Sequence, residues 1–183
     1  MTTTNRQYDE AIKSCRDIFI QKTGDYGTAW RVLRTISVAD QLFIKAKRIR
    51  TIQEKKTQKI GDNIASEFKG ILNYAVIGLI QLELPEDETE ELGVERAGDL
   101  YNDKIMQARA LMQDKNHDYG EAWRDLSQES FTDLILSKLL RIRQIIGNDG
   151  KTLISEGIDA NYYDIINYAA FALILIGEGK QVG

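Results

Sequence analysis

The sequence of 183 residues has few of the residue types that build disulfides, zinc sites and catalytic triads. Its single cysteine, Cys15, cannot form an internal disulfide, and no cluster of cysteine and histidine offers zinc ligands. A catalytic triad is excluded because the one histidine, His117, has no serine or cysteine nucleophile beside it. Glycine-rich phosphate loops of the Walker and Rossmann types are also missing.

The chain also lacks an excess of positive charge and a long apolar run. The net charge of −4 and the isoelectric point of about 5.2 argue against general binding to duplex nucleic acid, which needs a basic surface. A single nucleotide needs only about two or three cations, so nucleotide binding stays open. The longest apolar stretch, residues 165–176, is interrupted by Asn167 and is too short to span a bilayer. Because the first residues lack a signal-peptide pattern, we expect a cytoplasmic protein that does not bind membranes.

The chain does contain an internal repeat. The segment DYGTAWR at residues 25–31 returns as DYGEAWR at residues 118–124, displaced by 93 positions. An ungapped comparison of residues 8–52 with residues 101–145 gives 18 identities in 45 pairs. A unit this short usually cannot bury its apolar face alone, so we expect the two copies to pack against each other as a covalent pseudo-dimer.

The boundary between the copies is marked by the single proline, Pro85, and the acidic residues that follow it. We place copy one at residues 1–84, an acidic and solvated linker at 85–98, and copy two at 99–183. The two copies are expected to form one globular unit.

Apolar residues at helical spacing predict three helices in each copy, and no alternating strand pattern is present. The second helices are predicted at residues 38–55 and 131–146, and the third at residues 64–82 and 158–177. A turn at the DYG segment leads into a short helix, because its glycine tolerates a positive φ. The fold class is therefore all-α, with six main helices.

Two cations on the second helix of copy two are candidates for binding phosphate. Lys138 and Arg141 are three residues apart and lie beside an apolar stripe, so their charged ends should point into a crevice. Arginine grips phosphate oxygens in a fork, and lysine acts as a point charge. Copy one repeats the pair as Lys45 and Arg48. The alternative is an internal ion pair with an acid on a neighbouring helix.

The third helix of copy two supplies such an acid. Asp164 lies among apolar residues, three positions before Asn167, and a carboxylate there needs a cation or a metal. The two cations of the preceding helix could supply the charge, or a magnesium ion could replace them. Copy one keeps the asparagine as Asn73 but has Gly70 in place of the aspartate. Its own cations would therefore lack an acid, unless Glu67, which lies about one helical turn earlier, neutralises them.

Two further groups of residues have both a functional and a structural interpretation. Tyr119 and Trp123, which repeat Tyr26 and Trp30, could stack on a base or could pack in the core. The aspartate before each tyrosine, Asp118 in copy two, could simply cap the short helix.

Glu156 and Asp159 lie near the start of the third helix, where the helix dipole favours acids. On a continuous helix Glu156 would lie about 12 Å from Asp164 along the axis, which one metal cannot bridge. A shared metal site therefore requires a break near Gly157.

Four motifs of copy two resemble those of a known family: Lys115-x-x-Asp118-Tyr119-Gly120-x-Ala122-Trp123, Lys138-x-x-Arg141-Ile142, Glu156-x-x-Asp159 and Asp164-x-x-Asn167-Tyr168. With them the chain resembles the nucleotide modification associated domain 1 family, a helical family of largely uncharacterised proteins from bacteria and phages. The resemblance covers both copies, and it implies a link to nucleotide or modified-base metabolism.

More distantly, the chain is similar to the all-α NTP pyrophosphatases of the MazG and dimeric dUTPase type, which bind magnesium through two pairs of acids. This similarity implies magnesium-dependent hydrolysis of a (deoxy)nucleoside triphosphate, in which Glu156, Asp159 and Asp164 hold the metal and orient water. The first acidic pair is absent, because that helix carries Lys138 and Arg141 instead. The candidate substrate-binding residues are Lys115, Asp118, Tyr119, Trp123, Lys138, Arg141 and Asn167.

Other functions remain open on the sequence. Copy one, with Gly70, is either degenerate or completes the site across the interface. The chain could instead be a non-catalytic helical module that binds a nucleotide or a partner protein, or a purely structural protein. A homodimer of pseudo-dimers is also plausible for a duplicated helical unit.

Overall fold

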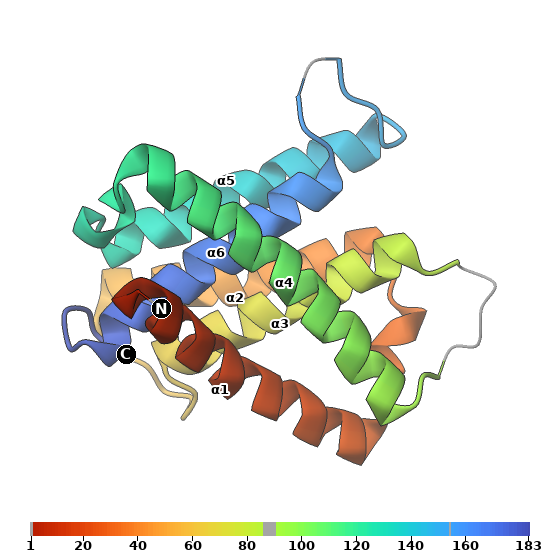
Figure 1. The fold of residues 1–183 in the computed structure, drawn as a ribbon, viewed down its shortest axis with the longest axis horizontal. Coiled ribbons are helices and arrows are strands. Elements are labelled where there is room, and N and C mark those ends of the chain that lie inside the picture. The colour runs from red at the N-terminus through yellow and green to blue at the C-terminus, as the bar shows by residue number, and fades with distance from the viewer. Residues whose placement is uncertain (1, 86–90, 154) are drawn as a thin grey trace.

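A computed structural model gives the fold and describes residues 2–85, 91–153 and 155–183. Within these ranges the chain forms six α-helices, two short 3₁₀ helices and no strand, which confirms the predicted all-α fold (Figure 1). In chain order the elements are α1 (Thr3–Tyr26), η1 (Ala29–Val32), α2 (Thr35–Lys55), α3 (Ile64–Glu83), α4 (Val94–Tyr119), η2 (Ala122–Asp125), α5 (Gln128–Gly147) and α6 (Ile158–Gly177).

The two most apolar helices, α3 and α6, pack against each other at the centre of the molecule (Figure 1). They are apolar on most sides because other helices surround them: α2 covers α3, α5 covers α6, and α1 and α4 cross over both. Gly78 lets α3 approach α6 closely, since a Cβ at this position would lie 2.6 Å from the ring of Tyr162. One hydrophobic core therefore spans both copies.

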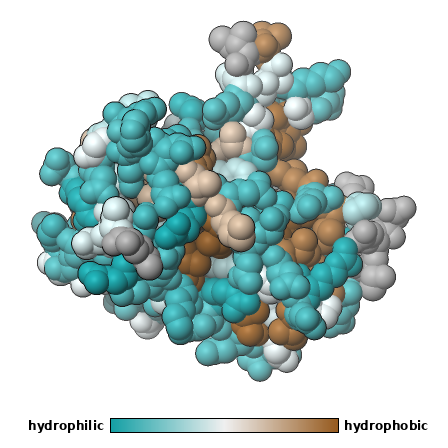
Figure 2. Space-filling view, in the orientation of Figure 1, coloured by the Kyte–Doolittle hydropathy of each residue, from teal (hydrophilic) through white to brown (hydrophobic). Residues whose placement is uncertain are grey.

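The surface has the character expected of a helical protein whose apolar residues lie mostly in the core. Hydrophilic residues cover most of the face shown in Figure 2, and hydrophobic residues appear in smaller patches among them. In the part of the chain that the structure describes, no helix has both the length and the apolar character needed to cross a membrane.

Two reciprocal hydrogen bonds join the copies. The hydroxyl of Tyr8 in α1 donates to Asn167 Oδ1 in α6 at 2.8 Å. The hydroxyl of Tyr101 in α4 donates to Asn73 Oδ1 in α3 at 2.7 Å. Each asparagine also donates its Nδ2 to a backbone carbonyl, and all four residues are buried. Because these residues occupy matching places in the repeat, the same bond is made once in each direction, as in a two-fold symmetric dimer.

The predicted helix boundaries differ from the observed ones mainly at the linker. The second helices begin three residues earlier than predicted, and the third helices agree to within one residue. The predicted linker, residues 85–98, extends too far because α4 already begins at Val94. Its acidic centre, residues 86–90, lies outside the described residues.

The DYG segments end the first helix of each copy. Gly27 and Gly120 follow α1 and α4 with φ of +64° and +61°, which confirms the predicted turn chemistry. Asp25 and Asp118 lie in the last turns of these helices. The predicted capping role is therefore wrong for both, because other residues hold the cap positions of η1 and η2.

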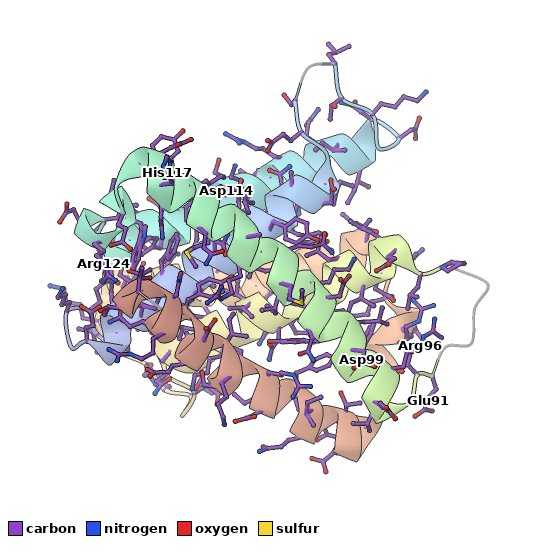
Figure 3. All side chains as sticks on the ribbon, in the orientation of Figure 1. Glu91, Arg96, Asp99, Asp114, His117 and Arg124 are labelled. Carbon is purple, nitrogen blue, oxygen red and sulfur yellow. The ribbon has the colours of Figure 1, made fainter. Side chains whose placement is uncertain are left out.

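Arg124 holds η2 against the ends of α1 and α6 (Figure 3). Its guanidinium donates to Glu178 Oε1, Thr4 Oγ1 and Gln7 Oε1, each at 2.8 Å. Hydrogen bonds from Lys180, Gln7 and Arg124 outweigh the effect of burial and lower the pKa of Glu178 from 4.5 to about 2.

We expect the stabilising effect of Glu178 to disappear in acid. A carboxylate with a lowered folded-state pKa stabilises the protein above its unfolded pKa, here 4.5, and loses this effect as the pH falls toward about 2. Urea unfolding should therefore show Glu178→Gln to be less stable than the wild type at pH 7, with a difference that shrinks between pH 4.5 and 2. The exposed Glu10→Gln is the control and should show little difference at any pH. A deficit of Glu178→Gln that persists unchanged in strong acid would contradict this role.

Candidate functional site

The buried acid of copy two is bound by two lysines from neighbouring helices. Asp164 in α6 has 7% of its surface exposed. Lys115 Nζ of α4 lies 2.8 Å from Asp164 Oδ1, and Lys138 Nζ of α5 lies 2.9 Å from Asp164 Oδ2. Burial disfavours the charged form of Lys115, but the hydrogen bond to Asp164 and the attraction of nearby negative charges, mainly that of Asp164, together outweigh it and raise the lysine pKa. Each carboxylate oxygen is thus paired with one ammonium group.

Arg141 does not join this cluster. Its side chain is exposed, and among the described residues it forms no hydrogen bond or ion pair. It lines a separate surface hollow of about 1170 Å³ together with Glu156 and Asn161. The predicted pair of Lys138 and Arg141 is therefore divided: the lysine binds Asp164, and the arginine faces solvent.

The three acids predicted as magnesium ligands do not converge either. α6 begins at Ile158, so the chain does break near Gly157 as a shared site would require. However, Glu156 and Asp159 are exposed, while Asp164 is buried against the lysines. Over residues 2–85, 91–153 and 155–183, no group of three or more His, Cys, Asp or Glu residues is placed to hold a metal. The predicted donor set does not fit a magnesium ion.

The remaining candidates of copy two are either used inside the protein or exposed. Trp123 stacks on Phe171, with ring centroids 4.1 Å apart and an interplanar angle of 5°. The side-chain amide of Asn167 accepts the buried hydrogen bond from Tyr8 of copy one and donates to the Ala108 carbonyl within copy two. Tyr119 is 73% exposed, and Asp118 contacts the neighbouring His117 ring. Copy two therefore gathers few of the predicted substrate-binding groups around one space.

A known family matches the chain twice, once in each copy of the repeat. The family model for nucleotide modification associated domain 1 matches residues 22–82 and, separately, residues 115–176. The chain belongs to the nucleotide modification associated domain 1 family. Comparison with curated proteins and with solved structures gave no match. The predicted family resemblance and the internal duplication are both confirmed, with one nucleotide modification associated domain in each copy.

The nucleotide modification associated domain of copy one contains a pocket that the sequence did not single out. It has a volume of about 620 Å³ and lies between α1, η1, α2 and α3. Its wall combines cationic and aromatic side chains. Among the residues that line it are Lys22, Lys45, Lys69, Gly70, Trp30 and Tyr74.

Gly70 leaves room for the side chain of Lys45 on the wall of this pocket. It occupies the place that Asp164 holds in copy two. A Cβ at Gly70 would lie only 3.1–3.2 Å from the side-chain atoms of Lys45, so the lysine lies directly over the glycine. The signal that could have revealed the pocket was thus the missing side chain at Gly70, rather than any residue with its own chemistry.

The acid of copy one is displaced by about one helical turn. Buried Glu67 lies 3.3 Å from Arg48 Nη1 but 4.0 Å from Lys45 Nζ, so its main partner is the arginine. Glu67 therefore acts as the neutralising acid, which is one of the two possibilities that the sequence leaves open. The charge of Lys45 is only weakly satisfied, and Lys22 is exposed with no hydrogen bond or ion pair among the described residues.

The aromatic residues also differ between the two nucleotide modification associated domains. Trp30 is partly exposed on the pocket wall and contacts Phe19 at a centroid distance of 6.2 Å. In copy two the equivalent Trp123 is buried under Phe171, which takes the place of the smaller Ile77. The larger ring fills the space beside the tryptophan. Copy one has a lined pocket where copy two holds the ion pairs of Asp164 and the stacked rings of Trp123 and Phe171.

Proposed function

We propose that the chain is a nucleotide-binding module and that the pocket of copy one holds the ligand. The observation that carries this proposal is the 620 Å³ cavity with lysines and aromatic rings on the same wall. Its volume falls in the range of about 300–1,000 Å³ that small-molecule sites usually have. Membership of a nucleotide modification associated family agrees with such a ligand.

The two kinds of side chain suit the two ends of a nucleotide. Trp30 and Tyr74 offer faces on which a base can stack, an interaction worth about 1–3 kcal/mol per base. Lys45 lies 5.8 Å from the centre of the Tyr74 ring, so cation and aromatic surface adjoin. Lysine ammonium groups act as point charges toward phosphate. Base and phosphate could therefore be held at the same time.

Binding without turnover is supported better than magnesium-dependent hydrolysis. The hydrolase interpretation needs Glu156, Asp159 and Asp164 around one metal, and the first two lie exposed while the third is paired with lysines. The pocket of copy one needs no such rearrangement to accept a ligand. We therefore favour the non-catalytic alternative over a nucleoside triphosphate pyrophosphohydrolase.

Isothermal titration of the protein with purine and pyrimidine nucleotides tests this proposal. We expect at least one nucleotide to bind in the presence of a chelator, and Lys45→Gln to weaken its binding by about tenfold or more, since a charged hydrogen bond is lost. Lys47→Gln is the matched control, because this exposed lysine of the same helix does not line the pocket. Binding is expected to quench the fluorescence of Trp30, measured in a Trp123→Phe background.

Three results would decide against the module. If no nucleotide binds, or if Lys45→Gln and Lys47→Gln bind equally well, the pocket is not the site. If the protein releases phosphate or pyrophosphate from a nucleotide and a chelator stops this, the chain is an enzyme.

A further inference from the structure

We propose that the ligand carries a single phosphate, which binds between Lys22 and Lys45 beside Gly70. This inference rests on the proposed nucleotide-binding function and names the ligand class as a nucleoside monophosphate. The phosphate pairs with these two lysines as the carboxylate of Asp164 pairs with Lys115 and Lys138 in copy two.

Copy two shows how an anion binds between the two equivalent lysines. In copy two the anion between the two lysines is a side chain: Asp164 gives one oxygen to Lys115 and the other to Lys138, at 2.8 and 2.9 Å. Lys22 and Lys45 are the same lysines in copy one, 93 positions earlier. A phosphate resembles a carboxylate in presenting two oxygens to two cations.

Copy one keeps both lysines and removes the anion. Gly70 has no side chain to place between them, and Lys45 lies over its backbone. The acid that remains nearby, Glu67, is closer to Arg48 than to Lys45. The guanidinium also donates to the carbonyl of Asp62 at 2.7 Å. Over residues 2–85, 91–153 and 155–183, the lysine pair of copy one therefore has no carboxylate as close as the one that pairs with its counterpart.

The charge of the pocket favours one phosphate over three. Its lining holds the three lysines Lys22, Lys45 and Lys69 and the two acids Asp62 and Glu67. Because Arg48 neutralises Glu67, the net charge around the pocket is +2. A phosphate monoester carries about −1.5 to −2 at neutral pH, which this lining nearly balances. A triphosphate would bring further charge toward two carboxylates. It would need additional cations that the pocket lacks.

The aromatic side chains then determine the direction in which the nucleoside extends from the phosphate. Lys45 is near the Tyr74 ring, so a phosphate between the lysines leaves the nucleoside to extend along Tyr74 and Trp30. The base stacks there, and the sugar lies between base and phosphate. Nothing in this arrangement requires a residue from copy two.

The affinities of a nucleoside and its 5′-mono-, di- and triphosphate, titrated without metal, test the inference. We expect the monophosphate to bind about tenfold or more tightly than the nucleoside, because two charged hydrogen bonds are gained. The second and third phosphates should add little or should weaken binding.

Gly70→Asp provides the sharper test, because it installs in copy one the aspartate of copy two. The new carboxylate should occupy the phosphate position and reduce monophosphate affinity by about tenfold or more, with the affinity of the nucleoside changed much less. Gly70→Asn adds a side chain of the same size without the charge and should retain more monophosphate binding. Should Gly70→Asp fail to fold, Lys22→Gln replaces it, since this exposed residue can lose its charge without disturbing the core.

The possible outcomes separate this inference from the proposed function. If neither nucleosides nor nucleotides bind, both fail. If nucleoside, monophosphate and triphosphate bind equally, or if Gly70→Asp and Lys22→Gln bind the monophosphate like the wild type, the pocket still binds nucleotides but the phosphate position is wrong. A clear preference for the triphosphate without metal would overturn the ligand class alone.

Discussion

Replacement of Asp164 by alanine is expected to lower the free energy of unfolding by about 3 kcal/mol. Removing one partner of a buried ion pair usually costs about 3–5 kcal/mol, because the other charge stays buried without compensation. Here two lysines lose their acid, but the side chain of Lys115 is 48% exposed and can recover water. The side chain of Lys138 is only 14% exposed and cannot do so easily. We therefore expect the lower end of that range, measured by urea unfolding at neutral pH.

Asp159→Ala is the matched control for this change. It removes an exposed acid from the first turn of the same helix, where the dipole term is worth about 0.3–1 kcal/mol. Inorganic phosphate should also restore some of the stability of Asp164→Ala, since an anion that binds the freed lysines favours the folded state. If Asp164→Ala is no less stable than Asp159→Ala, the two lysine contacts contribute little and copy two is a weak template for the phosphate position in copy one.

The helices and the repeat are predictable from sequence because both depend on local patterns. The third helices agree with their predicted ranges almost to the residue, since α3 and α6 are apolar on most sides and bounded by polar turns. The predicted end of the linker is too late because acidic residues are compatible both with a solvated linker and with the first turn of a helix, here α4. Nothing about Val94 itself indicates whether the linker continues there or the helix begins.

The site is harder to predict because its decisive contacts join distant segments of the chain. The sequence pattern links Lys138 with Asp164, but Lys115 comes from a helix whose crossing over α6 no local pattern reveals. A sequence also draws attention to residues that carry chemical groups and not to positions where a side chain is small or missing. It points to Asp164, whereas the cavity lies in copy one, where Gly70 and Ile77 are the smaller members of their pairs.

The two tryptophans of the repeat are expected to respond very differently to the same substitution. Trp123→Ala should lower the free energy of unfolding by about 3–5 kcal/mol, the usual cost for a buried aromatic residue. Its ring is stacked on Phe171, its Nε1 donates to Asn116 Oδ1 at 3.1 Å, and the Arg124 guanidinium lies 4.5 Å from the ring centre. All three contacts are lost together, and the alanine leaves a cavity in the core.

Trp30→Ala is the matched variant in copy one, and its main effect should be on the ligand. Because Trp30 is partly exposed and faces an existing pocket, its loss creates less new cavity and should cost clearly less stability than Trp123→Ala. It should also weaken nucleotide binding by about five- to a hundredfold, which corresponds to the loss of one stacked base. Urea unfolding and titration of both variants measure the two effects. Equal losses of stability, with nucleotide affinity unchanged in Trp30→Ala, would mean that both tryptophans serve only packing and that the two copies have not diverged in role.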